Sequence, residues 1–278
     1  MTSGTRFPAR SSGAKAGLLA CLLCGLVFLV GCAQTGAAPS AASMQEPITD
    51  SDEPEVRKRA RIRIELAAGY FAEGQTTVAL DEIKLALQAD PTYAPAYALR
   101  GLVYMQLNNS ALAEESFKRA IQLNPRDPDA LHNYGWFECQ AGRYAQSTDL
   151  FRRALASPVY GGQARSLLAM GICQIRAGQL AEAEASLARS YELDAGNPIV
   201  AYNLASLQFR RGEASKAQFT IRRLNNTDLA NAETLWLGIK VERQLQNTQA
   251  MTQLAQQLGR RYPESAQWAN YQRGAFNE

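Results

Sequence analysis

Histidine is almost absent from this 278-residue sequence, which has a single one at position 132. Histidine is the side chain best suited to proton transfer near neutral pH and is a common metal ligand. His132 stands beside Asn133 in an expected helix, where a packing or groove role suits it better than a catalytic one. With Cys139 and Cys173 it lacks the paired spacing of a zinc site, and the sequence has no glycine-rich phosphate-binding loop. We therefore expect a protein that is not an enzyme and needs no metal, cofactor or small-molecule substrate.

Charge is missing from residues 16–31, AGLLACLLCGLVFLVG, which follow a basic leader without acidic residues. Sixteen such residues are short for a membrane-spanning helix, which needs about 20, and slightly long for the apolar core of an export signal, about 7–15. The run ends in LVGC, with the small Gly31 directly before Cys32. This pattern resembles a bacterial lipobox. An uncleaved anchor and a chance match remain as alternatives.

The resemblance to a lipobox implies that residues 1–31 are removed and that Cys32 becomes the lipid-bearing N-terminus. Proteins of that type carry diacylglycerol on the thiol and an acyl chain, such as palmitate, on the amine. Several acyl chains on one residue give stable anchoring, whereas a single chain is marginal. Ala33 rather than Asp follows the cysteine. In a Gram-negative host this implies a lipid anchor in the outer membrane, with the protein on its periplasmic face.

Net charge is also lacking in the expected mature chain. Removing residues 1–31 takes away three of the 29 basic residues and none of the 26 acidic ones, which leaves 26 of each. A neutral body has no general electrostatic attraction for nucleic acid, which we exclude as a partner. Residues 32–53 are small and polar and contain proline, which favours a flexible tether with a reach of roughly 25 Å.

A repeated pattern accounts for residues 54–263. The first two copies match at 34-residue spacing: Ala67, Tyr70, Ala79, Ile83, Ala86 and Pro91 with Gly101, Tyr104, Ala113, Phe117, Ala120 and Pro125. Later copies align at Gly135, Gly171, Ala205 and Gly238. The small first residue lets a second helix approach the first closely, and the spacing of the next apolar residues places them on one helical face.

Turn residues divide each copy into two helices. Five of them stand where the first helix must end, namely Gly74, Asn108, Gly142, Gly178 and Gly212. Prolines mark the exit from the second helix, namely Pro91, Pro125, Pro158 and Pro263. The pattern resembles the tetratricopeptide repeat (TPR). This implies an all-α solenoid of about six helix hairpins in a right-handed superhelix. The approximate repeats are 60–93, 94–127, 128–162, 163–197, 198–230 and 231–263, with a capping segment at 264–278.

An apolar stripe runs along the first helices at spacing i, i+4, i+7 and is not needed for the repeat pattern itself. In the fifth and sixth copies this spacing gives Tyr202, Ser206 and Phe209, then Leu235, Ile239 and Glu242. We expect part of it to form a hydrophobic groove for a partner protein. The groove residues are Ile64, Phe71, Leu102, Met105, His132, Trp136 and Ile172. Burial of the same residues between adjoining helices is the alternative. TPR modules that hold acidic peptide ends carry Lys, Arg and Asn here, whereas Asn133 and Asn203 stand nearly alone, so an apolar or amphipathic segment fits better.

Two further features leave alternatives open. Cys139 and Cys173 lie on consecutive repeats and either form a disulfide, which export permits, or serve as two small buried side chains. The basic run around Arg57 and Arg61 either forms a solvated helix face or touches lipid headgroups near the tether.

The lipobox, the tether and six TPR-like copies together resemble the type IV pilus biogenesis lipoproteins of the PilF/PilW family. The resemblance implies a pilotin, which binds the secretin subunit of the type IV pilus and promotes its outer-membrane localisation and multimer assembly. Cys32 would then be the anchor, and the groove of the early repeats would hold the secretin. The fifth and sixth copies depart most from the repeat pattern. A general lipidated scaffold for cell-wall or other envelope-assembly enzymes is the alternative.

Overall fold

A computed structural model describes residues 52–276, which contain thirteen α-helices and no β-strand. The signal peptide, Cys32 and most of the tether that the sequence predicts lie outside the described residues. The helices are α1 (Glu55–Ala72), α2 (Thr76–Ala89), α3 (Ala94–Gln106), α4 (Ser110–Leu123), α5 (Pro128–Gln140), α6 (Tyr144–Leu155), α7 (Gln163–Arg176), α8 (Leu180–Leu193), α9 (Pro198–Arg210), α10 (Ala214–Asn225), α11 (Ala232–Gln244), α12 (Thr248–Arg261) and α13 (Ala266–Arg273).

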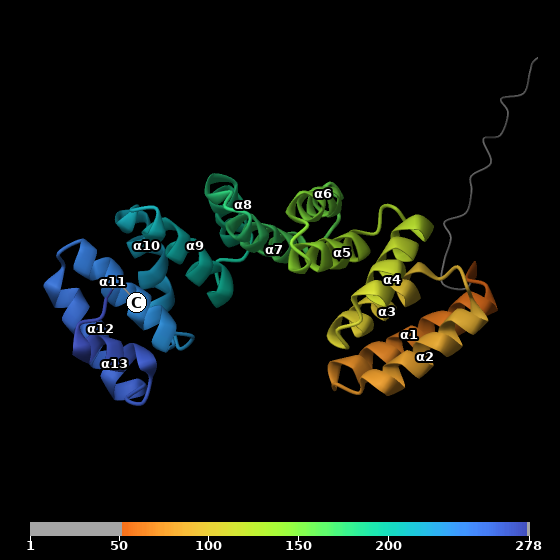
Figure 1. Ribbon diagram of the computed structural model, residues 1–278, viewed down its shortest axis with the longest axis horizontal. Coiled ribbons are helices and arrows are strands. Elements are labelled where there is room, and N and C mark those ends of the chain that lie inside the picture. Colours follow the sequence, from red (N-terminus) through yellow and green to blue (C-terminus); the bar gives the residue numbers. More distant parts are fainter. Residues whose placement is uncertain (1–51, 277–278) are drawn as a thin grey trace, which may run out of the picture. The chain divides into compact units, whose positions relative to one another are not determined.

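The first twelve helices pack as six consecutive hairpins, from α1 with α2 to α11 with α12 (Figure 1). The second helix of each hairpin contacts the first helix of the next one. First helices also contact one another directly, as α1 does with α3 and α3 with α5. The predicted all-α fold of helix-hairpin repeats is therefore confirmed. The last helix, α13, packs on both members of the sixth hairpin.

Each hairpin turns through one residue with positive φ. The five turn residues predicted from the sequence all adopt this left-handed conformation, for example Gly74 at φ 77° and Asn108 at φ 56°. In the first hairpin, the amide of Gln75 donates to the carbonyl of Tyr70 at 2.8 Å and closes the end of α1. Glycine suits this position because it has no Cβ to collide with the backbone.

The sixth hairpin lies one residue later than the sequence pattern predicts. Its turn residue is Gln246, at φ 56°, which follows Gly212 by 34 residues. The position equivalent to Ala205 is therefore Ile239, which is fully buried, and not Gly238. The alignment on Gly238 misplaced the turn by one residue, although the contact that it implied is present: a Cβ on Gly238 would approach Asn225 to 2.6 Å and Leu254 to 3.0 Å.

Small residues allow the two helices of a hairpin to cross closely. A Cβ placed on Gly101 would lie 2.6 Å from the ring of Phe117, which is completely buried between α3 and α4. Gly135 meets Phe151 in the same way, and Gly171 meets Leu187. These contacts match the small-and-bulky pairing that the sequence predicts for each repeat.

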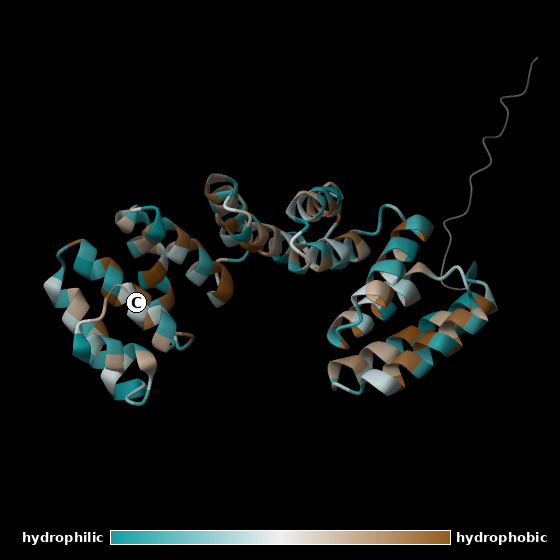
Figure 2. Cartoon of the chain, viewed as in Figure 1, coloured by the Kyte–Doolittle hydropathy of each residue, from teal (hydrophilic) through white to brown (hydrophobic). Residues whose placement is uncertain are grey.

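The core continues from one hairpin into the next. The first cluster of buried side chains draws on α1, α2 and α3, and the next one on α4, α5 and α6, with Tyr160 beyond them. Figure 2 shows hydrophobic and hydrophilic residues alternating along the individual helices, as amphipathic packing requires. At the C-terminal end Trp268, Tyr271 and Phe276 cover the last cluster, whose buried members include Trp236.

A disulfide joins Cys139 on α5 to Cys173 on α7. The two Cα atoms are 5.7 Å apart, and both side chains are almost completely buried in a cluster with Phe151 and Met170. The sequence left this pairing open. The bond closes a ring across two consecutive repeats, because the cysteines are 34 residues apart.

Gly101 and Gly69 make a matched pair for testing the close helix crossing. We expect Gly101→Ala to destabilise the protein by about 1–3 kcal/mol, since the new methyl group meets a ring that has no free space. Gly69, in α1, has nothing within 4 Å of an added Cβ. Gly69→Ala should therefore stabilise by about 0.5–1 kcal/mol through helix propensity. Urea unfolding followed by circular dichroism measures both, and equal effects would contradict the role of the crossing.

The disulfide should make a large contribution to stability. Closing a 34-residue ring restricts the unfolded chain, so replacing both cysteines by alanine should lower the free energy of unfolding by about 3–4 kcal/mol. Urea unfolding of the wild type with and without a reductant provides the comparison. The reduced wild type should resemble the double variant, and a double variant as stable as the oxidised protein would refute the expectation.

Candidate protein-interaction face

Five of the seven predicted groove residues are partly exposed on consecutive first helices. These are Phe71 on α1, Leu102 and Met105 on α3, Trp136 on α5 and Ile172 on α7. All five side chains are apolar or aromatic, and each occupies the same face of its own helix in the repeat pattern. We call these five residues the exposed stripe.

The exposed stripe rests on the core beneath it. Leu102 packs against the first core cluster and also against the second, so it links the cores of neighbouring hairpins. Phe71 lies against the first cluster and Met105 against the second. The inner parts of these side chains are thereby fixed by packing, while their outer parts remain in contact with water. Such side chains can bind an apolar partner surface without a large loss of side-chain entropy.

Trp136 is held from two sides. It packs against the cluster that contains the disulfide, and the guanidinium of Arg176 lies 5.5 Å from the centre of its ring. Arg176 belongs to the last turn of α7, so this contact joins two first helices. A cation above the indole covers part of the ring and adds a positive charge at the edge of the exposed stripe.

Ile64 and His132 do not belong to an exposed groove. Ile64 is 9% exposed and is part of the first core cluster. His132 is 8% exposed, and its ring meets that of Phe151 edge-on at 5.5 Å. The prediction for these two residues was wrong because the neighbouring helices cover this part of α1 and α5.

A chain of hydrogen bonds explains the environment of His132. Arg165 donates to the hydroxyl of Tyr160 at 3.2 Å, this hydroxyl lies 3.0 Å from Ser166 Oγ, and Ser166 Oγ lies 2.8 Å from His132 Nδ1. Because the arginine can only donate, we infer that each following hydroxyl donates onward and that Nδ1 accepts. Burial, with a smaller effect of the Arg165 charge, lowers the pKa of His132 to about 4.

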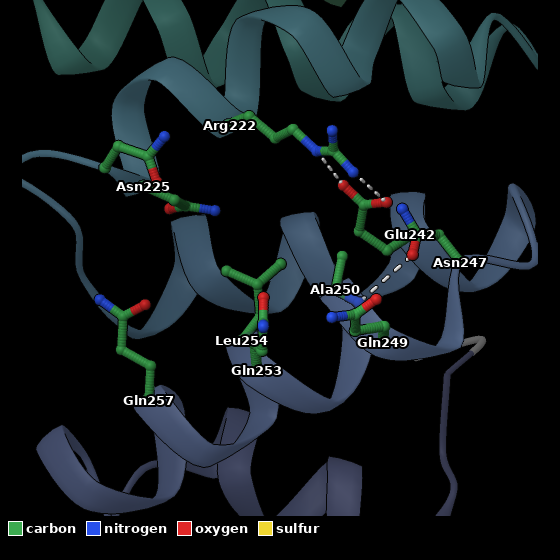
Figure 3. Close-up of a pocket in the computed structure, with 10 residues that line it drawn as sticks. Arg222, Asn225, Glu242, Asn247, Gln249, Ala250, Gln253, Leu254 and Gln257 are labelled. Carbon is green, nitrogen blue, oxygen red and sulfur yellow. Dashed lines mark hydrogen bonds and ion pairs between the residues drawn. The ribbon is translucent and has the colours of Figure 1, made fainter.

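The corrected register changes which residues of the sixth repeat continue the stripe. The sequence pattern placed Leu235, Ile239 and Glu242 there, but all three are buried. Glu242 instead accepts hydrogen bonds from Arg222 on α10, at 2.5 and 3.0 Å (Figure 3). This ion pair lines a hollow of about 450 Å³ between α10 and α12, where Gln249 and Gln253 also lie.

One position later in α11 stand Trp236, which is 6% exposed, and the two cations Lys240 and Arg243, which are more exposed. The sequence pattern did not reveal these two cations, because it was aligned on Gly238 and not on the constant 34-residue spacing of the turns. Counting 34 residues from Gly212 would have found them. In the fifth repeat Tyr202 and Phe209 continue the stripe as predicted, and both are partly exposed.

The basic run at the start of α1 is paired with carboxylates. Arg57 contacts Asp90 at 2.9 Å, Arg61 contacts Glu53 and Glu65, and Arg63 contacts Glu82 at 2.8 Å. Exposed pairs of this kind contribute little to stability. They do satisfy these guanidinium groups, which favours the reading of a solvated helix face over contact with lipid headgroups.

Neither a metal site nor a membrane-spanning helix is found among the described residues. Between residues 52 and 276, no group of three or more His, Cys, Asp or Glu side chains is arranged to hold a metal ion. None of the helices in this part of the chain combines the length and apolar character that crossing a bilayer requires. What the exposed stripe can do chemically is to bury apolar surface of a partner.

Comparison with known proteins connects this fold to pilus biogenesis. Three tetratricopeptide-repeat family models match residues 94–127, 116–148 and 174–234. The chain is 27% identical over 248 residues to the type IV pilus assembly protein PilF of Pseudomonas aeruginosa, covering 89% of this chain and 96% of that protein.

Two solved structures are similar over almost their whole length. The crystal structure of PilW, a widely conserved type IV pilus biogenesis factor, has a TM-score of 0.69 and 30% identity, covering 79% of this chain and 99% of PilW. The structure of PilF from Pseudomonas aeruginosa has a TM-score of 0.71 and 25% identity, covering 80% of this chain and all of that one.

The buried histidine predicts a pH dependence of stability. His132 is neutral in the folded protein down to about pH 4, whereas in the unfolded chain it binds a proton below about pH 6.5. The contribution of the neutral His132 side chain to the free energy of unfolding is therefore complete above about pH 6.5 and is lost as the pH falls toward 4. Between pH 7 and pH 4.5 the wild type should lose roughly 2 kcal/mol more stability than His132→Asn, measured by urea unfolding. Parallel losses in both proteins would contradict this.

Proposed function

The chain belongs to the family of type IV pilus biogenesis TPR proteins that contains PilF and PilW, and from this premise we propose that it is a pilotin. It binds the secretin subunit of the type IV pilus through the exposed stripe and promotes the localisation of that subunit to the outer membrane and its assembly into multimers. It does so without catalysis, as a protein-interaction module.

One observation carries the proposal, namely that the exposed stripe remains partly uncovered along four consecutive first helices. Apolar surface contributes roughly 25 cal/mol per Å² when a partner buries it. A segment with its own apolar face, such as an amphipathic helix, would match a row of side chains on parallel helices. The ring of Trp136 and the side chain of Met105 are the types of residue that are enriched at the centres of interfaces.

The proposed anchor is Cys32, with acyl chains that hold the protein on the periplasmic face of the outer membrane. The tether of residues 32–53 would let the repeats stand off the bilayer by roughly 25 Å. Confinement to a thin layer raises the effective concentration of bound secretin subunits for one another. Anchoring would in this way favour multimer assembly without any chemical step.

The test measures the amount and membrane location of heat-resistant secretin multimers in a strain with a chromosomal replacement. Leu102→Gln with Met105→Gln keeps helix propensity and removes two apolar contacts of the exposed stripe. We expect multimers to fall at least about tenfold, toward the level of a deletion strain. Phe219→Gln is the matched control, since Phe219 is a large apolar residue on α10 that is 72% exposed outside the stripe. It should leave the multimers unchanged.

A second arm tests the anchor with Cys32→Ala exported by a cleavable, non-lipid signal. The proposal expects multimers to be absent or in the wrong membrane, because the carrier is no longer tethered. Multimers at wild-type level and location in the deletion strain would refute the pilotin function. Co-purification of cell-wall synthases or hydrolases with the wild type, in place of secretin, would then indicate an envelope scaffold.

A further inference from the structure

Two adjoining hollows lie on the first-helix face of the last two repeats. One, of about 220 Å³, is formed by α9, α11 and the start of α13. The other, of about 370 Å³, reaches from α9 and α11 to Phe276. Phe209 and Lys240 line both of them. We call the two hollows together the C-terminal pocket. Nothing in the proposed pilotin function uses it.

Aromatic rings form much of the wall of the C-terminal pocket. Tyr202, Phe209 and Trp236 line the smaller hollow, and Phe276 lines the larger one. Trp236 and Phe276 stack on each other, with their ring centres 5.3 Å apart. Because Trp236 also packs in the last core cluster, this wall is fixed in place. It offers a rigid apolar surface of the kind that binding pockets use.

Three cations line the same pocket. The Lys240 ammonium is 5.6 Å from the centre of the Trp236 ring, and the Arg243 guanidinium is 4.1 Å from that of Phe276. Arg210 lines the smaller hollow beside them. Within residues 52–276, none of the three makes an ion pair with a carboxylate. The pocket has one acidic side chain, Glu233, so its balance of charge is positive.

This lack of partners contrasts with the cations of the neighbouring helices. Arg211 contacts Glu184 at 2.9 Å, Lys216 contacts Glu213 at 2.6 Å, and Arg222 contacts Glu242. Several cations at the end of α9 and on α10 are therefore neutralised by carboxylates, although Arg223 is not. Three cations without such a pair gather where the aromatic wall lies.

The positions of Lys240 and Arg243 suit them to a carboxylate ligand. Burial alone lowers the pKa of Lys240, so the ammonium gives up hydration without gaining a counter-charge. A carboxylate brought beside it would offset that cost. The guanidinium of Arg243 stacks on a ring, which orients it, and its N–H groups can then hold both oxygens of one carboxylate.

We propose that the C-terminal pocket is a second binding site, for an internal stretch of a partner protein in which an acidic side chain neighbours an aromatic or aliphatic one. The acidic side chain reaches Lys240 and Arg243, and its neighbour packs on the aromatic wall. The smaller hollow lies below, and the larger one near the lower end of, the roughly 300–1,000 Å³ typical of small-molecule sites, which suits one side chain in each. This site is chemically unlike the exposed stripe and acts independently of it.

Random twelve-residue peptides displayed on phage provide the first test. The full chain, purified in a mild non-ionic detergent, is used for selection beside the double variant Lys240→Met, Arg243→Gln. The wild type should enrich peptides with Asp or Glu next to Phe, Leu or a similar residue, and the double variant should not. Arg223→Gln is the matched control, because Arg223 lies 6.0 Å from the ring of Tyr191, outside the pocket and without an ion pair in the described chain. It should enrich the same peptides as the wild type.

Fluorescence anisotropy then measures one enriched peptide, amidated at its C-terminus, against its counterpart with Asn or Gln in place of the acid. We expect the counterpart to bind at least about tenfold more weakly to the wild type, and the double variant to bind the acidic peptide with a similar loss. Unchanged melting temperatures would show that the double variant is folded. Leu102→Gln with Met105→Gln should bind the acidic peptide normally, whether or not the pilotin function holds.

Three results would overturn the proposal. The first is selection without enrichment of acidic residues, and the second is equal binding of the acidic peptide by wild type and double variant. The third is a neutral peptide with a free C-terminal carboxylate that binds as tightly as the amidated acidic peptide. This result would mean that the pocket recognises chain ends.

Discussion

The close crossing of the two helices in each hairpin is the constraint on which the rest of the structure depends. A bulky ring such as Phe117 fits only where the facing residue has no side chain, as at Gly101. Once this contact is made, the face of each first helix that points into the hairpin is settled. The turn between the helices must then occur at a fixed distance, which accounts for the left-handed residue at Gly74 and its equivalents. Residues on the remaining face are released from packing and are free to serve binding.

The sequence predicted those parts of the fold that depend on local chemistry. Positive φ at Gly74 or Gly142 follows from the properties of glycine, and the crossing at Gly101 follows from its spacing to Phe117. The sixth repeat was placed one residue too early because its turn residue is Gln246, and glutamine is not a residue type that indicates a turn. Gly238 gave a competing signal, since a glycine near a helix crossing looks the same in either register.

Other features depend on neighbours that spacing alone does not reveal. Ile64 and His132 share a helix face with Phe71 and Trp136, yet adjoining helices cover the first two and leave the others partly exposed. The bond between Cys139 and the cysteine of the next repeat likewise requires knowing how far apart two first helices stand. For the C-terminal pocket, the aromatic residues were visible in the sequence. Their meeting with unpaired cations follows only once α11 is in its correct register.

The disulfide between α5 and α7 also determines how the protein carries mechanical load. A pull applied between the first and the last repeat must pass from Cys139 directly to Cys173 through the covalent bond. The 33 residues between them are bypassed, so about 110 Å of chain cannot be drawn out even if that segment unfolds. The middle of the repeat array therefore behaves as an inextensible link, and any lengthening under tension is left to the hairpins on either side.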